Sequence, residues 1–245
     1  MRKSVGMSVL FLFAAVGAAH AQTWTDGQEI TYTQPDWNGG SMGTTASTLL
    51  NADFNTVYFS TAGVLIVGGK YTMEFDSALA VENYIPAVGM IGPLDASLSD
   101  PTTSASGSFG GDVVALTLDV NFSSLTGASG PAFGNLVIDG IPAQFPQFPA
   151  LSGVDGLTVS QFLAQLDILL GGGSLPSGYT IAELDPIAIQ IEDSFTDGTP
   201  STFAQDALLA PTTVVTPEPS TLLLFATGIG LIGMAMSVRR RKQIA

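Results

Sequence analysis

The chain contains no cysteine, and its only histidine, His20, lies close to the N-terminus. Without cysteine there is no disulfide framework, no thiolate metal site and no cysteine nucleophile. If residues 1–21 are removed, as argued below, no imidazole is left for a serine–histidine triad or a histidine-ligated metal. The mature fold must therefore rest on the burial of apolar side chains, for which a chain of roughly 200 residues is long enough.

Basic side chains are almost absent between the two ends of the chain. Lys70 is the only one in residues 22–218, which contain all 21 acidic residues, so one positive charge against 21 negative charges leaves −20. Phosphate clamps and nucleic-acid-binding faces need clustered arginine and lysine, so we exclude a nucleic-acid partner. An acidic surface is also repelled by anionic membranes and anionic glycans.

Residues 1–21 have the anatomy of a secretory signal peptide. A basic start is followed by an apolar run that is too short to span a membrane comfortably. Ala19 and Ala21 fit the small-x-small rule for signal cleavage, which makes Gln22 the expected mature N-terminus. An uncleaved membrane anchor is the alternative interpretation.

Residues 22–150 are predicted to form a mainly β, sandwich-like domain. Residues 64–67 and 71–75 are β-branched and aromatic runs separated by two glycines, which predicts a hairpin. Period-two alternation would turn Tyr71, Met73 and Phe75 inward. Further short strands are expected at residues 30–32, 57–59 and 136–138.

The most regular alternation of apolar and polar side chains covers residues 113–122. Val114, Leu116 and Leu118 would face one side of a strand, so the pattern predicts a strand there. A helix is the alternative, because Val113, Leu116 and Val120 would also share one helical face.

Residues 151–209 are predicted to be a short α-helical hairpin region that packs on the β-rich domain. Thr158 and Gln161 have the spacing of a capping box, and apolar residues then recur at helical spacing. Gly171-Gly172-Gly173 should end this first helix and form a loop.

The second helix of this region poses a conflict between two local signals. Thr180 and Glu183 form another capping box, which favours a helix start. Pro186 would clash with the preceding turn of a helix that began there. We therefore expect a turn first, and then a helix over residues 186–195 with Asp185 as its N-cap.

The end of the chain has three parts after a Pro/Thr linker at residues 210–216. Pro217, Glu218 and Pro219 come first, and the apolar residues 221–238 then predict a single transmembrane helix. By the positive-inside rule, the basic cluster that follows should act as a cytoplasmic stop. Its members are Arg239, Arg240, Arg241 and Lys242.

These three parts, at residues 217–242, resemble the PEP-CTERM sorting signal of Gram-negative bacteria. The resemblance implies that an exosortase, a membrane-embedded protease of the cysteine type, recognises Pro217, Glu218 and Pro219 and cuts the tail. It also implies an inner-membrane precursor that is delivered to the cell surface or to an exopolysaccharide or biofilm matrix. An ordinary C-terminal anchor that happens to follow Pro-Glu-Pro is the alternative.

The absence of cysteine, histidine and clustered basic residues does not exclude three further kinds of chemistry, which are glycoside hydrolysis, sugar binding and calcium binding. A glycosidase needs only two carboxylic acids at a suitable separation, and the chain has many. Trp24, Tyr32 and Trp37 lie near acidic residues and would suit sugar stacking if exposed, although core packing is their more common use. Glu192, Asp193 and Asp197-Gly198 are clustered but do not match the calcium-binding EF-hand loop, so we predict no metal site.

We therefore expect a non-enzymatic exported protein of the cell surface or matrix, without a cofactor. Its processing partners would be signal peptidase and an exosortase, and extracellular polysaccharide is a further class of partner. A lectin-like carbohydrate-binding module is the alternative, followed by a carboxylate-dependent glycoside hydrolase.

The signal-peptide interpretation has a direct test. The protein recovered from the exported fraction should begin at Gln22, because signal peptidase cuts after the small-x-small triplet that ends at Ala21. N-terminal sequencing measures this. A sequence that begins at Met1 in the exported fraction would contradict the prediction.

Overall fold

The computed structural model describes residues 23–40, 43–147 and 149–211, so the predicted signal peptide and sorting tail lie outside the described residues. Within this part about 48% of the residues are helical and 9% are in strands, so the expected mainly β fold is wrong. The described residues as far as Ala210 belong to one compact unit with a shared apolar core.

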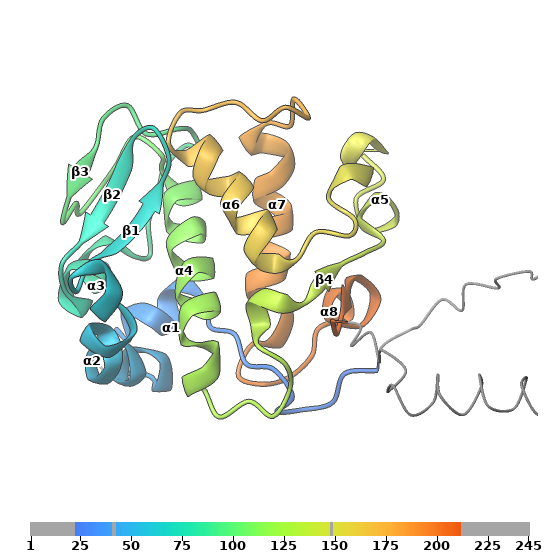
Figure 1. The fold of residues 1–245 in the computed structure, drawn as a ribbon, viewed down its shortest axis with the longest axis horizontal. Helices are drawn as coiled ribbons and strands as arrows, with labels where there is room; N and C mark the ends of the chain where they lie inside the picture. The colour runs from blue at the N-terminus through green and yellow to red at the C-terminus, as the bar shows by residue number, and fades with distance from the viewer. Residues whose placement is uncertain (1–22, 41–42, 148, 212–245) are drawn as a thin grey trace, which may run out of the picture. The chain divides into compact units, whose positions relative to one another are not determined.

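Helix α4 (Ser108–Phe122) lies at the centre of this unit (Figure 1). It packs against α6 (Val159–Leu170) and α7 (Ile181–Glu192), and α4 and α7 run in the same direction. Every residue of α4 from Phe109 to Asp119 is buried.

The strand expected at residues 113–122 is therefore wrong, and the helical alternative is correct. A helix that is buried on all sides has no polar face, so its sequence lacks the 3.6-residue period of a surface helix. What remains is a run rich in valine and leucine, which resembles a buried strand. The burial of α4 thus removed the signal that would have identified it.

The predicted hairpin is confirmed. Strand β1 (Leu65–Gly68) pairs antiparallel with β2 (Thr72–Phe75), and the two-residue strand β3 (Leu98–Ser99) adds parallel to β2. Met73 and Phe75 are buried and Glu74 is exposed, as the period-two pattern requires.

The glycine triplet after α6 holds this hairpin against the helices. The N–H of Tyr71 donates to the carbonyl of Gly171 over 3.0 Å. A Cβ on Gly171 would lie only 2.7 Å from the Cα of Gly69, so only glycine permits this approach of two backbones. The predicted loop therefore also has a packing role.

Most of the remaining expected strands are absent from the described residues. Residues 57–59 belong to the end of α2 (Thr45–Val57) and the short 3₁₀ helix η1 (Phe59–Thr61), and residues 30–32 make only an isolated bridge between Thr31 and Thr196. The strand at residues 136–138 is confirmed as β4 (Val137–Ile138), which pairs with β5 (Leu208–Leu209). The other helices are α1 (Gln34–Asn38), α3 (Ala78–Tyr84), α5 (Ile141–Gln144) and α8 (Thr202–Ala207).

Helix α6 begins at the predicted capping box of Thr158 and Gln161, but the expected start of α7 is wrong. The helix begins at Ile181 and runs through Pro186, and Asp185 lies inside it rather than at its N-cap. A helix-interior proline costs about 3 kcal/mol. The buried stripe of Leu184, Ala188 and Ile191, together with the Thr180 cap, offsets that cost.

Close packing at α4 gives a test of this architecture. In an open helix, Gly→Ala stabilises by about 1 kcal/mol. A Cβ on Gly111, however, would lie 2.6 Å from Cδ of Gln34, which is itself buried and held by hydrogen bonds. Because overpacking costs about 1–3 kcal/mol, Gly111→Ala should lower the free energy of unfolding in urea by about 1–2 kcal/mol.

The matched control removes the obstacle. In a Gln34→Ala background the same Gly111→Ala exchange should become stabilising, because only the helix-propensity gain is left. Stabilisation by Gly111→Ala in the parent chain would mean that Gln34 does not pack against α4 as described.

Candidate functional site

The aromatic residues proposed for sugar stacking are buried. Trp24, Tyr32 and Trp37 are 3%, 4% and 0% exposed. Trp24 packs edge-on against Phe195 and donates from Nε1 to the carbonyl of Leu208 over 2.8 Å. The core-packing interpretation is therefore correct for these rings, and neither tryptophan presents an exposed face to a sugar.

Buried carboxyl groups are the most unusual feature of the described residues. Five acidic side chains are at most 6% exposed, whereas Lys70, the only basic residue in the described part, lies over the Tyr71 ring, with Nζ 4.8 Å from its centroid. Buried carboxylates without a basic partner are costly, so these groups tend to keep their protons. The five are Glu29, Asp112, Asp119, Asp185 and Glu192.

Four of these acids form one group between two helices, which we call the acid quartet. Asp112 and Asp119 lie on α4, and Asp185 and Glu192 lie on α7. Each pair is seven residues apart, which places both members on the same face of their helix. The carboxyl groups of Asp112 and Asp185 lie within hydrogen-bonding reach of each other, and Asp119 acts electrostatically on Glu192.

The segment from Tyr32 to Trp37 supplies neutral hydrogen-bond donors to the acid quartet. Gln34 donates from Nε2 to Oδ1 of Asp112 over 2.5 Å and from its backbone N–H to Oε1 of Glu192 over 2.9 Å. Asp119 Oδ1 accepts from the Tyr32 N–H over 2.9 Å and from Trp37 Nε1 over 3.1 Å. These N–H donors favour the ionised form of each acid and so act to lower its pKa, but they carry no charge and their effect is smaller than that of burial.

Burial raises the pKa of every member of the acid quartet. The pKa of Asp112 rises to about 7, and the charge of Asp185 adds to the effect of burial. Burial holds the pKa of Asp119 and of Glu192 well above the usual range, and it raises that of Asp185. Outside the quartet, burial raises the pKa of Glu29 to about 8.

The positions of these acidic side chains bear on two alternatives from the sequence, a carboxylate-dependent hydrolase and a calcium site. Asp112 and Asp185 lie close together, but each is only 6% exposed, and neither lines one of the principal hollows of the described residues. Glu192 turns inward to Gln34, whereas Asp193 and Asp197 are exposed. Among the described residues, no three acidic side chains are placed to hold a metal ion.

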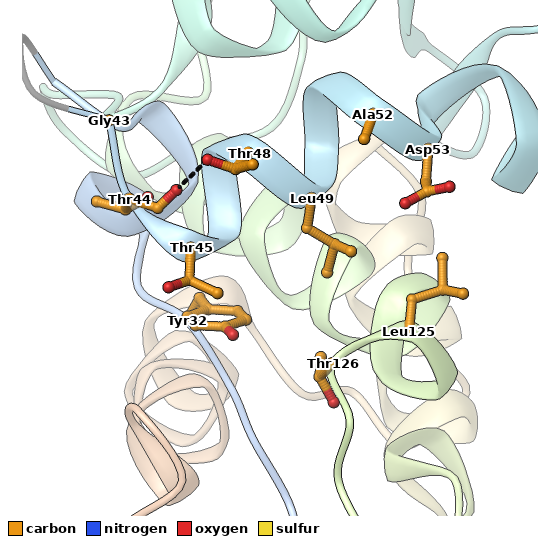
Figure 2. Close-up of a pocket in the computed structure, with 10 residues that line it drawn as sticks. All are labelled: Tyr32, Gly43, Thr44, Thr45, Thr48, Leu49, Ala52, Asp53, Leu125 and Thr126. Carbon is orange, nitrogen blue, oxygen red and sulfur yellow. Dashed lines mark hydrogen bonds between the residues drawn. The ribbon is translucent and has the colours of Figure 1, made fainter.

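A hollow with a volume of about 680 Å³ lies beside α2. Figure 2 shows Leu49 and Asp53 of α2 pointing toward it, with Leu125 and Thr126 on the opposite side and Tyr32 at one end. The remaining wall is lined by Gly43, Thr44, Thr45, Thr48 and Ala52.

This hollow offers acceptors rather than cationic donors. Thr48 uses its hydroxyl proton to bond the carbonyl of Thr44 over 2.8 Å, and Thr126 donates to the carbonyl of Ser123 over 2.9 Å. Their lone pairs and the half-buried carboxyl group of Asp53 remain. The hollow therefore suits a ligand with several hydroxyl donors and disfavours an anion.

The end of the chain matches a known family. The sequence model of the PEP-CTERM protein-sorting motif matches residues 215–242. The chain carries a PEP-CTERM sorting motif. This match confirms the resemblance found in the sequence and supports a chain that is exported and processed by an exosortase. No curated protein and no solved structure matches the chain.

The PEP-CTERM motif includes Pro217, Glu218, Pro219 and the basic cluster at residues 239–242, all of which lie outside the described residues. The signal-cleavage residues Ala19, Ala21 and Gln22 and the predicted membrane helix at residues 221–238 lie outside them as well. Within residues 23–40, 43–147 and 149–211, no helix is long and apolar enough to cross a membrane.

The acid quartet was missed in the sequence, although one signal for it was present. Asp112 and Asp119 interrupt an otherwise apolar and small-residue run, and Asp185 and Glu192 repeat the same spacing of seven. Read as helices, both segments place two acids on one face. Reading residues 113–122 as a strand concealed that relation.

Proposed function

We propose that the compact unit up to Ala210 is a non-catalytic component of the cell surface or extracellular matrix, released from its membrane tail by an exosortase. The observation that carries the proposal is the PEP-CTERM motif at residues 215–242, which follows this unit directly. In this proposal the compact unit is the part that is exported, and the PEP-CTERM motif determines where it is delivered.

Two features of the unit support a passive role. The carboxyl pair closest to a hydrolase arrangement, Asp112 and Asp185, is sealed between α4 and α7 rather than placed in a cleft. Residues 22–218 also carry a formal charge of −20, which favours solubility and keeps like-charged copies apart.

The tail fits the steps that this role requires. Proline disfavours helix both at and before its position, so the sequence predicts an extended backbone at Pro217 and Pro219 that a protease can reach. The apolar residues 221–238 would hold the precursor in the inner membrane until it is cut, and the basic cluster at residues 239–242 would fix its orientation.

Replacing Pro217, Glu218 and Pro219 with alanines should block delivery without blocking insertion. In a host that has an exosortase, the parent chain should yield a smaller form beyond the inner membrane, whereas the alanine variant stays full-length in that membrane. Cell fractionation followed by immunoblotting of an internal tag measures both.

The matched control replaces Arg239, Arg240, Arg241 and Lys242 with glutamine, which should weaken the cytoplasmic stop and leave Pro-Glu-Pro intact. If the parent and the alanine variant both stay full-length in the exosortase host, the tail is only an anchor.

A second candidate function rests on the hollow beside α2. Its threonine hydroxyls, the Asp53 carboxyl group and the apolar Leu49 and Leu125 are the groups with which proteins bind neutral, polyhydroxylated ligands. We propose neutral glycans as its ligand class, since Asp53 would repel anionic ones. This replaces the buried Trp24 and Trp37 as the place where a sugar would bind.

Filling the hollow tests this second candidate. A neutral glucan oligosaccharide should bind in titration calorimetry, whereas an anionic uronate oligosaccharide should not. Thr48→Trp should lower the affinity at least about tenfold, because the indole occupies the hollow. Leu79→Trp on α3, whose side chain is 62% exposed and does not line the hollow, is the control. Equal binding by both tryptophan variants, or no glucan binding at all, would exclude the hollow as a glycan site.

A further inference from the structure

We propose that α4 and α7 form a proton-dependent clasp. The two helices pack together while the acid quartet between them retains protons, and the contact between them opens more readily as rising pH removes those protons. The proposal rests on where the four carboxyl groups lie and on what surrounds them, and it is independent of the function proposed for the unit.

The first step is the geometry of the contact. The quartet members are 6%, 1%, 6% and 5% exposed in the order Asp112, Asp119, Asp185 and Glu192, so water cannot solvate a charge there. Oδ2 of Asp112 and Oδ1 of Asp185 have no donor from any other described group, which leaves a shared proton as the link between the two helices.

The second step is the charge of the surroundings. The titratable groups that act on the quartet from neighbouring elements are acids or phenols, and none of them is basic. Lys70 lies on the β1–β2 hairpin turn over the Tyr71 ring. The groups are Asp36 on α1, Asp193 directly after α7, Tyr32 just before α1 and Tyr84 on α3, while Asp167 of α6 accepts from the Gly68 N–H instead.

The third step is the direction of the pH effect. Unfolded aspartic and glutamic acids ionise near pH 4, whereas burial raises the pKa of Asp112 to about 7 and holds that of Asp119 and Glu192 well above the usual range. The closed contact therefore binds more protons than the open one between pH 4 and 7. Stability must therefore fall as pH rises above about 4, and it levels off once the last member of the acid quartet has lost its proton.

The fourth step is why the response is local. The acids lie on one pair of facing helix surfaces, and the Tyr32–Trp37 segment covers them with neutral donors only. Helix α2 contributes no member to the quartet and no hydrogen bond to it. Loss of protons therefore acts first on α4, on α7 and on the segment that bridges them.

Peptide-resolved hydrogen exchange on the full-length chain, in non-ionic detergent with a chelator present, tests the clasp. After correction for intrinsic exchange rates, protection in α4 and α7 should fall by about tenfold per pH unit for each proton released between pH 5 and pH 7. Protection in α2 should change much less.

Asp112→Asn is the decisive variant. Its side-chain oxygen can still accept from Gln34, and its amide can still donate to Asp185, but it has no proton to lose. It should keep α4 and α7 protected at pH 8, with a fall about tenfold smaller per pH unit than in the parent. Asp95→Asn removes the same charge at an exposed site and should follow the parent.

The clasp is refuted if α4 and α7 are equally protected at pH 5 and pH 8, if Asp112→Asn loses as much as the parent, or if α2 loses protection to the same extent. Should Asp112→Asn fail to fold, Asp185→Asn tests the same contact, because it removes the charge beside Asp112 and must reduce the pH response.

Discussion

The burial of α4 on every side is the constraint on which the rest of the described fold depends. Because α4 has no face for water, each neighbouring element must cover part of it, and α6, α7, α1 and β1 do so. Two acids of α4 must then lie inside the protein. With only Lys70 to offset charge in the whole described part, protons and neutral donors take the place of salt bridges.

Local signals in the sequence predicted local structure well. The Thr158 cap set the start of α6, and two glycines between two apolar runs set the β1–β2 hairpin, because capping and turn chemistry act over a few residues. The fold class could not be predicted in this way. The central helix lacks an amphipathic period. Pro186 lies inside α7 because tertiary packing outweighs its low helix propensity.

The candidate sites also divide into one that a local sequence pattern identifies and two that depend on tertiary packing. The PEP-CTERM motif is linear, so Pro217, Glu218 and Pro219 could be identified from sequence alone. The acid quartet and the hollow beside α2 depend on segments far apart in the chain, such as Gln34 against Glu192 and Tyr32 near Leu125. The quartet could not be assembled before α4 and α7 were placed side by side, nor the hollow before the Tyr32 segment and Leu125 were placed beside α2.

The central physical claim is that carboxyl groups stay un-ionised inside this protein at neutral pH. Infrared absorption by the carbonyl stretch of protonated carboxyl groups measures this directly. The folded chain at pH 6.5 should show that band, Asp112→Asn should weaken it, and thermal unfolding should abolish it, since the unfolded acids ionise near pH 4. A folded chain with only ionised carboxylate bands at that pH would contradict the claim.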